Sequence, residues 1–168
     1  MSTAVRTTIK LFVDLDGVLA DFDRGVQELT GRPADSLPEP EMWRRIAAAA
    51  EFYDRLQWMP DGPRLWSFVR GLEPSVLTGL PHGNWAEPQK RRWCARELGR
   101  HVPVFTCRTR EKPLVAQLNC AAEETPVLID DRTRVADAWR KIGGIFIHHT
   151  SAASSTQQLE QILDALGI

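Results

Sequence analysis

The stretch that most constrains this chain is Phe12–Phe22, which reads FVDLDGVLADF. An apolar run from Val5 to Leu15 has the length and β-branched content of a buried strand. Asp14 and Asp16 stand where the run ends. Residues two apart in an extended chain face the same way, and Gly17 permits a tight turn after them. The two carboxylates are therefore predicted to point into one small volume.

Such a pair needs compensation for its charge. Two carboxylates about 4 Å apart repel by roughly 4 kcal/mol at an effective dielectric constant of 20. A hard divalent cation offsets this repulsion, and Mg²⁺ commonly takes one or two carboxylates and keeps several waters. A strand followed by a solvated Asp-Gly turn would have the same sequence pattern without binding a metal. The pair therefore predicts a Mg²⁺ site only in combination with other residues.

Composition limits the classes of partner. The chain has 168 residues, a length typical of one domain, and its 21 basic and 22 acidic residues give a net charge of −1. Without a basic stripe, no nucleic-acid partner is predicted. A small molecule is the expected partner, and the oligomeric state stays open.

Cysteine usage and hydropathy predict a cytoplasmic protein. The three cysteines, Cys94, Cys107 and Cys120, are widely spaced and include no CxxC pair, which argues against a disulfide framework or a zinc ribbon. Residues 1–10 lack the continuous apolar stretch of a signal peptide, and no window has the eighteen or more apolar residues of a membrane span. We therefore expect no membrane association.

From residue 73 onward, short apolar runs alternate with helical periodicities. Strands are predicted at 75–78, 102–107, 126–129 and 145–148, and helices at 84–98, 112–123 and 135–142, with a last helix capped by Ser155 and Gln158. Alternating strands and helices indicate right-handed βαβ units. The predicted fold class is α/β, a Rossmann-like three-layer fold with a mostly parallel five-stranded sheet.

The segment 21–72 has a different pattern, because its periodicities are helical only. Helices are predicted at 20–29, 41–56 and 61–72, with the proline-rich stretch 33–40 between the first two. We expect a small helical cap inserted after the first strand at 21–72, and a catalytic core formed by 1–20 and 73–168.

Polar residues follow four of the predicted strands. Ligands of parallel sheets bind beyond the carboxyl ends of the strands, where the winding reverses. The residues at these ends are Asp14 and Asp16, Thr78 and Gly79, Lys112, and Asp130 and Asp131. Carboxylates for Mg²⁺ and for nucleophilic attack, with a hydroxyl and a lysine for phosphate oxygens, form a phosphoryl-transfer set.

Four motifs in this order resemble a known family. FVDLDGVLADF, LTGLP, REKP and VLIDDR are similar to motifs one to four of haloacid dehalogenase (HAD) superfamily phosphatases. Within that superfamily, DGVLADF, a tryptophan-containing cap helix, the Lys90 and Trp93 pair and LIDDR resemble the 5'(3')-deoxyribonucleotidases. The likeness covers residues 9–149. It implies a HAD-like fold and Mg²⁺-dependent hydrolysis of nucleoside monophosphates through an aspartyl-phosphate.

The resemblance also implies roles for the acids. Asp14 would be the nucleophile, and Asp16 the general acid and then the base, with its backbone carbonyl reaching Mg²⁺. Asp131 would be a direct ligand and Asp130 would contact the ion through water. The sequence leaves open which of these two binds directly, and the pair could instead cap the following helix.

The remaining motif residues would bind phosphate. Thr78 would donate its hydroxyl to a phosphate oxygen beside the Gly79 amide, although a threonine ending a strand often serves only a turn. Lys112 would neutralise the phosphate and the nucleophile, and Lys90 is a rival for that role. Arg132, beside the acid pair, could reach the substrate.

Substrate choice is expected to depend on the cap. Phe22, Trp43 and Phe52 match aromatic positions that lie near the base in the nucleotidase group, and a flat aromatic wall suits a nucleobase. Aromatic residues at helical spacing also form ordinary cores. This chain lacks the pyrimidine-pocket aromatics of eukaryotic members between residues 29 and 41, so the base and sugar preference stays open.

Two other readings compete with a nucleotidase. A HAD phosphatase for a sugar phosphate or another small phosphoester would use the same residues. A receiver-like signalling domain also gathers acids, a threonine and a lysine, but its acceptor aspartate ends the third strand, where this chain has Cys107. Dehalogenase activity is not expected, because that chemistry has no use for an acid at the Asp16 position. A binding protein without catalytic activity is also disfavoured, because every polar group that the phosphatase mechanism needs is present.

Overall fold

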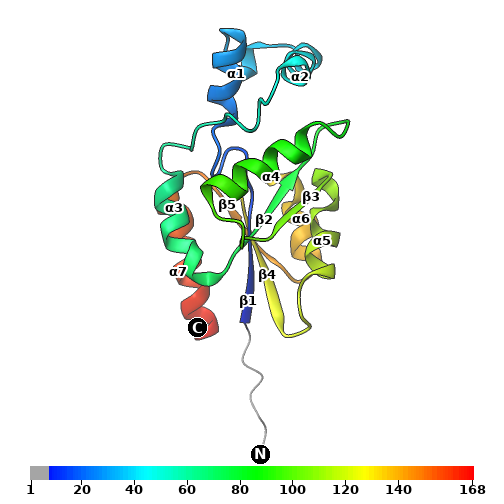
Figure 1. Ribbon diagram of the computed structural model, residues 1–168. Helices are drawn as coiled ribbons and strands as arrows, with labels where there is room; N and C mark the ends of the chain where they lie inside the picture. The colour runs from blue at the N-terminus through cyan, green and yellow to red at the C-terminus, as the bar shows by residue number, and fades with distance from the viewer. Residues whose placement is uncertain (1–7) are drawn as a thin grey trace, which may run out of the picture.

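A single parallel sheet forms the centre of the molecule (Figure 1). The computed structural model describes residues 8–168, so Val5 of the predicted first strand lies outside the described residues. The strands are β1 (Thr8–Val13), β2 (Ser75–Gly79), β3 (Val104–Cys107), β4 (Glu124–Asp130) and β5 (Ile145–His148), in the order β3-β2-β1-β4-β5. The winding reverses between β1 and β4, so a ligand site is expected at their carboxyl ends.

Helices cover both faces of the sheet, because side chains alternate along each strand. Leu11 and Val13 pack on one face with α3 (Gly62–Val69), α4 (Ala86–Glu97) and α7 (Ala152–Leu166). Phe12 packs on the other face with α5 (Lys112–Leu118) and α6 (Ala136–Lys141). The predicted Rossmann-like three-layer fold is confirmed. Short 3₁₀ turns, η2 (Arg70–Leu72), η3 (Thr109–Glu111) and η4 (Thr133–Val135), connect these layers.

A small helical cap rises above the carboxyl ends of the strands (Figure 1). It contains α1 (Phe22–Thr30), η1 (Ala34–Ser36) and α2 (Glu39–Ala48). The Asp21 side chain caps α1 by accepting from the Arg24 amide, and Gly31, with φ of 72°, ends it. By contrast, α3 packs beside α7 next to the sheet. The part of the chain that stands above the sheet is therefore shorter than the predicted insertion.

The two ends of the cap leave the core side by side. Ala20 pairs with Trp58 in an antiparallel bridge. The Asp21 amide donates to the Gln57 carbonyl at 2.8 Å, and the Met59 amide donates to the Leu19 carbonyl at 2.7 Å. This paired stem joins the cap directly to the loop that carries the first acid pair.

The second cap helix is shorter than predicted. It ends at Ala48 instead of residue 56, and Glu51 takes a left-handed φ of 58°. The following segment is bound to α4, because the Tyr53 amide donates to Gln89 Oε1 at 2.9 Å and Trp93 Nε1 donates to the Leu56 carbonyl at 2.8 Å. These contacts override the helical periodicity of the segment.

Two other predicted helix boundaries were wrong. Helix α5 ends at Leu118, five residues before the predicted end at residue 123. The last helix begins at Ala152, and its cap is Ser151, which accepts from the Ser154 amide at 3.1 Å. Ser155 therefore lies inside the first turn, where its buried hydroxyl bonds His149 Nδ1 at 2.7 Å.

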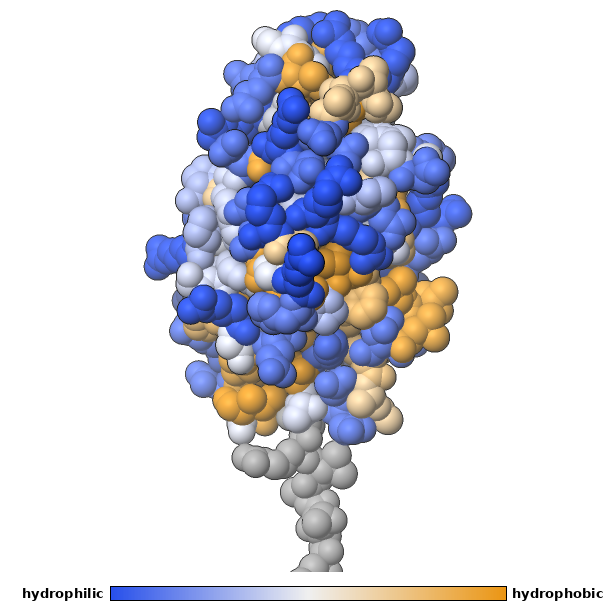
Figure 2. Space-filling model, viewed as in Figure 1, coloured by the Kyte–Doolittle hydropathy of each residue, from blue (hydrophilic) through white to orange (hydrophobic). Residues whose placement is uncertain are grey.

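The surface is mainly hydrophilic in the view of Figure 2, with an apolar area over α5. Leu114 and Leu118 of this helix are 56% and 74% exposed, so they contribute little to the core. Among residues 8–168, no helix combines the length and hydropathy needed to span a membrane.

Asp54 ties the cap segment after α2 to α4, and we expect its effect on stability to depend on pH. It accepts from Arg92 Nε at 2.8 Å and Arg96 Nη1 at 2.7 Å. Burial alone would raise the pKa of Asp54, but the two guanidinium groups lower it below the ordinary 3.8. A carboxyl whose pKa is lowered on folding stabilises the fold at pH values above its pKa in the unfolded chain. This contribution is lost as the pH falls through its pKa in the folded protein.

Asp54→Asn should therefore lower the melting temperature by about 2–4 °C at pH 7, corresponding to about 1 kcal/mol, and by much less near pH 3. Thermal denaturation at the two pH values measures this. Asp137→Asn, which removes only an exposed ion pair with Arg140, is the control and should change little. An equal loss at both pH values would contradict the ion-pair explanation.

Candidate active site

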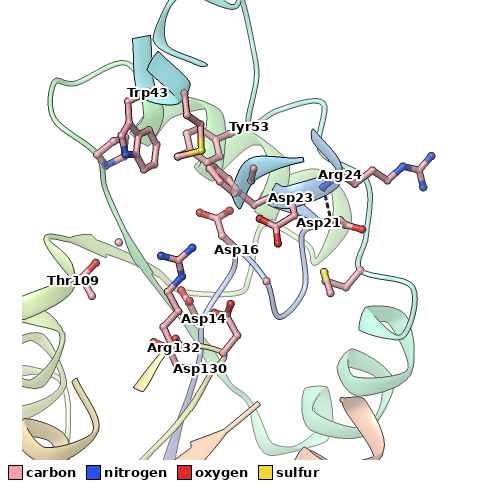
Figure 3. Close-up of a pocket in the computed structure, with 18 of the residues that line it drawn as sticks. Asp14, Asp16, Asp21, Asp23, Arg24, Trp43, Tyr53, Thr109, Asp130 and Arg132 are labelled. Atoms are coloured by element: carbon pink, nitrogen blue, oxygen red, sulfur yellow. Dashed lines mark hydrogen bonds between the residues drawn. The ribbon is translucent and has the colours of Figure 1, made fainter. Parts of the chain in front are cut away.

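A cavity of about 860 Å³ lies between the cap and the carboxyl ends of the strands (Figure 3). Its core side is lined by the ionisable residues of the predicted site: Asp14, Asp16, Lys90, Lys112, Asp130 and Asp131. Asp14 directly follows β1, and Asp130 ends β4, which pairs with β1. The topology of the sheet thus brings residues that are far apart in the sequence to one cavity.

Three acids converge at the floor of the cavity. Asp14, Asp130 and Asp131 each offer a carboxylate oxygen, and these oxygens lie within 4.8 Å of one another. The Asp14 amide donates to the Ile129 carbonyl at 2.9 Å, which fixes the end of β1 against β4. A cluster of this kind has the hard oxygen donors that Mg²⁺ prefers.

Lys112 neutralises part of this charge. Its Nζ lies 3.1 Å from Asp14 Oδ1 and 2.8 Å from Asp130 Oδ2, and the residue is 2% exposed. Burial alone would lower the pKa of Lys112, but the two carboxylates raise it, so the lysine stays charged. Burial also raises the pKa of Asp14, an effect that Lys112 opposes.

The two neighbouring acids of β4 have different surroundings. Both oxygens of Asp130 are used, because Oδ2 accepts from Lys112 and Oδ1 accepts from the Arg132 amide at 2.9 Å. Asp131 Oδ1 is buried without a hydrogen-bond partner among residues 8–168. Burial, followed by the charges of Asp14 and Asp130, raises the pKa of Asp131 to about 7. An unpartnered buried carboxylate oxygen in a three-acid cluster fits a bound divalent cation.

The loop after β1 approaches Asp131 closely. Gly17 has a φ of 78°, and a Cβ atom there would lie 2.3 Å from Asp131 Oδ2. Any side chain at this position would push into the acid cluster. Gly17 is therefore required for both the turn and the space beside Asp131.

Lys90 holds the second acid of the first motif. Its Nζ donates to Asp16 Oδ2 at 2.6 Å, to the Gly79 carbonyl at 2.7 Å and to Thr78 Oγ1 at 3.1 Å. Lys90 comes from the buried face of α4 and is 1% exposed. Burial raises the pKa of Asp16, although the Lys90 charge lowers it in part. The two rival lysines thus both reach the site, Lys112 at Asp14 and Lys90 at Asp16.

Thr78, the residue predicted to bind phosphate at the end of β2, contacts Lys90. Thr78 is fully buried and does not line the cavity, since its hydroxyl accepts from Lys90. Gly79 does line the cavity, as does Thr109, which sequence reasoning missed. The available signal was its position between the end of the third strand and Lys112.

The aromatic residues divide between the cavity and the interior of the cap. Phe22 and Trp43 line the cavity, whereas Phe52 is buried behind Phe22, with ring centroids 5.6 Å apart. Tyr53, also missed from the sequence, lines the cavity, and its ring centroid is 4.4 Å from Lys90 Nζ. Arg132 is exposed and lines the same cavity (Figure 3).

Comparisons with known proteins support the fold. The sequence matches no protein-family model and no curated protein. A solved hydrolase from Streptococcus pneumoniae TIGR4 is 13% identical with a TM-score of 0.55, and the match covers 94% of this chain and 99% of that one. A HAD hydrolase, family IA, variant 3, from Entamoeba histolytica HM-1:IMSS is 11% identical with a TM-score of 0.43, covering 96% and 100% of the two chains. The first of these has the same overall fold over nearly its whole length.

Proposed function

We infer that this protein is a Mg²⁺-dependent phosphomonoester hydrolase of the HAD superfamily. The observation that carries this inference is the pairing of two acids with two different lysines in one cavity. Asp14 contacts Lys112 beside the three-acid cluster, and Asp16 contacts Lys90. Two carboxylates in different surroundings suit two different chemical roles. The fold shared with a solved hydrolase agrees with this function.

The reaction begins with Asp14. Its carboxylate oxygen attacks the phosphorus atom, and the bond from phosphorus to the ester oxygen breaks, giving an aspartyl-phosphate. Lys112, next to Asp14, balances negative charge on the phosphoryl group as the bond forms. Asp16 gives its proton to the departing alcohol oxygen, a role that its raised pKa supports.

The second half of the reaction reuses Asp16. As a carboxylate, it removes a proton from a water molecule that attacks the phosphorus of the aspartyl-phosphate, releasing inorganic phosphate and restoring Asp14. Lys90 keeps Asp16 in place during both steps. Mg²⁺, when held by Asp14, Asp131 and the Asp16 carbonyl, would supply positive charge for the phosphate oxygens.

The proposed substrate is a nucleoside monophosphate, as in the 5'(3')-deoxyribonucleotidases. Trp43 and Tyr53 lie on the cap side of the cavity (Figure 3), and Phe22, which packs against both, completes an aromatic wall. The cap side also carries more carboxylates than cations: Asp21, Asp23, Asp35 and Glu39 against Arg24. Such a wall favours an uncharged, aromatic leaving group over one that carries further phosphates. The cytoplasmic location and the small-molecule partner stay predictions.

A panel of phosphomonoesters, assayed with and without Mg²⁺, tests this function. We expect nucleoside monophosphates to be hydrolysed with a kcat/KM at least about tenfold above that for ribose 5-phosphate or glycerol phosphate, and no turnover in EDTA. Trp43→Ala should reduce kcat/KM for nucleotides by about tenfold, because base stacking contributes about 1–3 kcal/mol, and should spare glycerol phosphate. Trp43→Phe keeps an aromatic face and should restore most of the loss.

Other results would replace the proposed substrate or the proposed reaction. Equal kcat/KM values for nucleotides and sugar phosphates would assign the enzyme to small phosphoesters. Stable phosphorylation without turnover would favour a phospho-acceptor signalling domain over an enzyme. In the structure, the residue at the end of β3, where a receiver has its acceptor aspartate, is the buried Cys107.

A further inference from the structure

Tyr53 is the only tyrosine of the chain, and it lines the cavity. The residue is 2% exposed, and among residues 8–168 its hydroxyl has no hydrogen-bond partner, since the bonds of Tyr53 are made by its backbone amide and carbonyl. A buried tyrosine hydroxyl usually has a partner. Unlike Ser75 Oγ, which is sealed inside the fold without one, the Tyr53 hydroxyl keeps access to the cavity. It is therefore a polar group available to a ligand of the cavity.

Contacts with several neighbours hold the Tyr53 ring in this position. The Tyr53 amide donates to Gln89 Oε1 at 2.9 Å, and the ring stacks on Trp85, with centroids 5.7 Å apart and 25° between the ring planes. Phe52 meets the ring edge-on, with centroids 5.2 Å apart. On a further side, Lys90 Nζ lies 4.4 Å from the ring centroid. A ring fixed in this way presents its hydroxyl to a ligand with little further loss of side-chain freedom on binding.

Contacts along the cavity wall place Tyr53 between Asp16 and Trp43. On one side, Lys90 Nζ lies over the Tyr53 ring and donates to Asp16 Oδ2 at 2.6 Å. On the other side, Phe22 packs against both Tyr53 and Trp43, with ring centroids 6.2 and 5.8 Å apart. Figure 3 shows Tyr53 and Trp43 on the cap side of the cavity, with Asp16 below them. In a nucleoside monophosphate, the sugar joins the ester oxygen to the base. If Asp16 protonates that oxygen and Trp43 stacks on the base, the sugar lies beside Tyr53.

The hydroxyl of Tyr53 is the free polar group of this aromatic wall. Burial, followed by the nearby charge of Asp16, raises the pKa of Tyr53 above its ordinary value, so the hydroxyl stays neutral and protonated. Phe22 has no polar side-chain atom, and Trp43 Nε1 already donates to Glu39 Oε1 at 3.3 Å. When a substrate displaces water from the cavity, an unpaired hydroxyl loses its hydrogen bonds unless the substrate replaces them. A sugar hydroxyl, which can both donate and accept, supplies such a partner.

We propose that the Tyr53 hydroxyl forms a hydrogen bond with a sugar hydroxyl of the substrate, and so selects nucleotides whose pentose carries one. This inference rests on the proposed function, with a nucleoside monophosphate as substrate, and it deepens that function by naming a residue that recognises the sugar. Trp43 would contact the base on one side of the sugar, and Asp16 the ester oxygen on the other. Tyr53 touches none of the reacting atoms in this arrangement, so its contribution is to specificity.

Tyr53→Phe tests the contact, because it removes the hydroxyl and keeps the ring that stacks on Trp85. The measurement is kcat/KM for the nucleoside 5'-monophosphate that wild type hydrolyses fastest and for its 2',3'-dideoxy counterpart with the same base. Wild type should favour the hydroxylated nucleotide, and Tyr53→Phe should reduce this preference by about three- to tenfold, the effect of losing one neutral hydrogen bond. Trp43→Ala, the control, should lower both values by the same factor and keep the preference. The melting temperature of Tyr53→Phe should stay within about 2 °C of wild type, because the hydroxyl has no partner among residues 8–168.

An equal preference in wild type and Tyr53→Phe would overturn the proposal, even if the variant is slower on both substrates, because a purely structural role of the hydroxyl affects both substrates alike. With a wild type that hydrolyses nucleotides, this result rejects only the role of Tyr53. A wild type that hydrolyses no phosphomonoester of the panel rejects the proposed function. Equal hydrolysis of nucleotides and sugar phosphates rejects the nucleotide substrate, and in both of these cases the role of Tyr53 is rejected as well.

Discussion

Replacing Asp14 by asparagine should abolish phosphomonoester hydrolysis, lowering kcat by at least about 10³-fold. An amide is too weak a nucleophile to attack phosphorus, and among residues 8–168 no other carboxylate at the end of β1 contacts Lys112. The other two acids of the three-acid cluster, Asp130 and Asp131, come from the end of β4. The measurement is kcat at saturating substrate in the presence of Mg²⁺.

The fold should survive this change. Because burial raises the pKa of Asp14, its charged form is unfavourable in the folded protein without metal, and an uncharged asparagine avoids that cost. We therefore expect the melting temperature of Asp14→Asn in EDTA to equal or exceed that of wild type. Asp137→Asn, the same change at an exposed position of α6, should keep full activity. Appreciable turnover by Asp14→Asn would exclude Asp14 as the nucleophile.

The general architecture of the site could be predicted because it depends on topology. Parallel strands align their carboxyl ends, so residues that end β1 and β4 must lie near one another whatever their separation in the chain. Asp14, Asp130 and Asp131 accordingly lie in one cluster. Alternating apolar runs also located the five strands, and the range predicted for β5, residues 145–148, agrees with the structure.

Side-chain direction at the strand ends could not be predicted in the same way. Thr78 and Gly79 are adjacent, yet only Gly79 lines the cavity. The Thr78 hydroxyl is bound by Lys90, a residue of α4 whose ammonium group also bonds the Gly79 carbonyl. A contact between a helix and the end of a strand leaves no periodic pattern in the sequence. The different contacts of Lys90 and Lys112 therefore could not be predicted from the sequence alone.

The cap shows a second limit of periodicity. Residues spaced by three and four between 42 and 56 predict one long helix, but the same spacing also suits an irregular segment that buries the same side chains. Tyr53 reaches the cavity because its amide is held by Gln89 and the helix has already ended at Ala48. The sequence pattern therefore predicted a helix through Tyr53 and missed Tyr53 as a residue of the cavity.

Asp131→Asn should remove most of the stabilisation that Mg²⁺ gives to the protein. Because a ligand that binds only the folded state stabilises it by mass action, Mg²⁺ at about 100 times its Kd should add about 2.7 kcal/mol, raising the melting temperature of wild type by about 5–10 °C. Asp131 supplies the only unpartnered buried oxygen of the described three-acid cluster. Its loss should therefore weaken Mg²⁺ binding more than the loss of Asp130, whose oxygens are bound by Lys112 and the Arg132 amide.

The same variant should behave oppositely without metal. The pKa of Asp131 is raised from the ordinary 3.8 to about 7, so this carboxyl destabilises the metal-free fold increasingly as the pH rises from 3.8 to about 7. Asp131→Asn in EDTA should thus melt at a higher temperature than wild type at pH 8, and this difference should be clearly smaller at pH 5. Thermal denaturation with and without Mg²⁺ at both pH values measures the two effects together. If Asp130→Asn loses the Mg²⁺-dependent shift while Asp131→Asn keeps it, the direct ligand is Asp130, and the unpartnered oxygen of Asp131 has another cause.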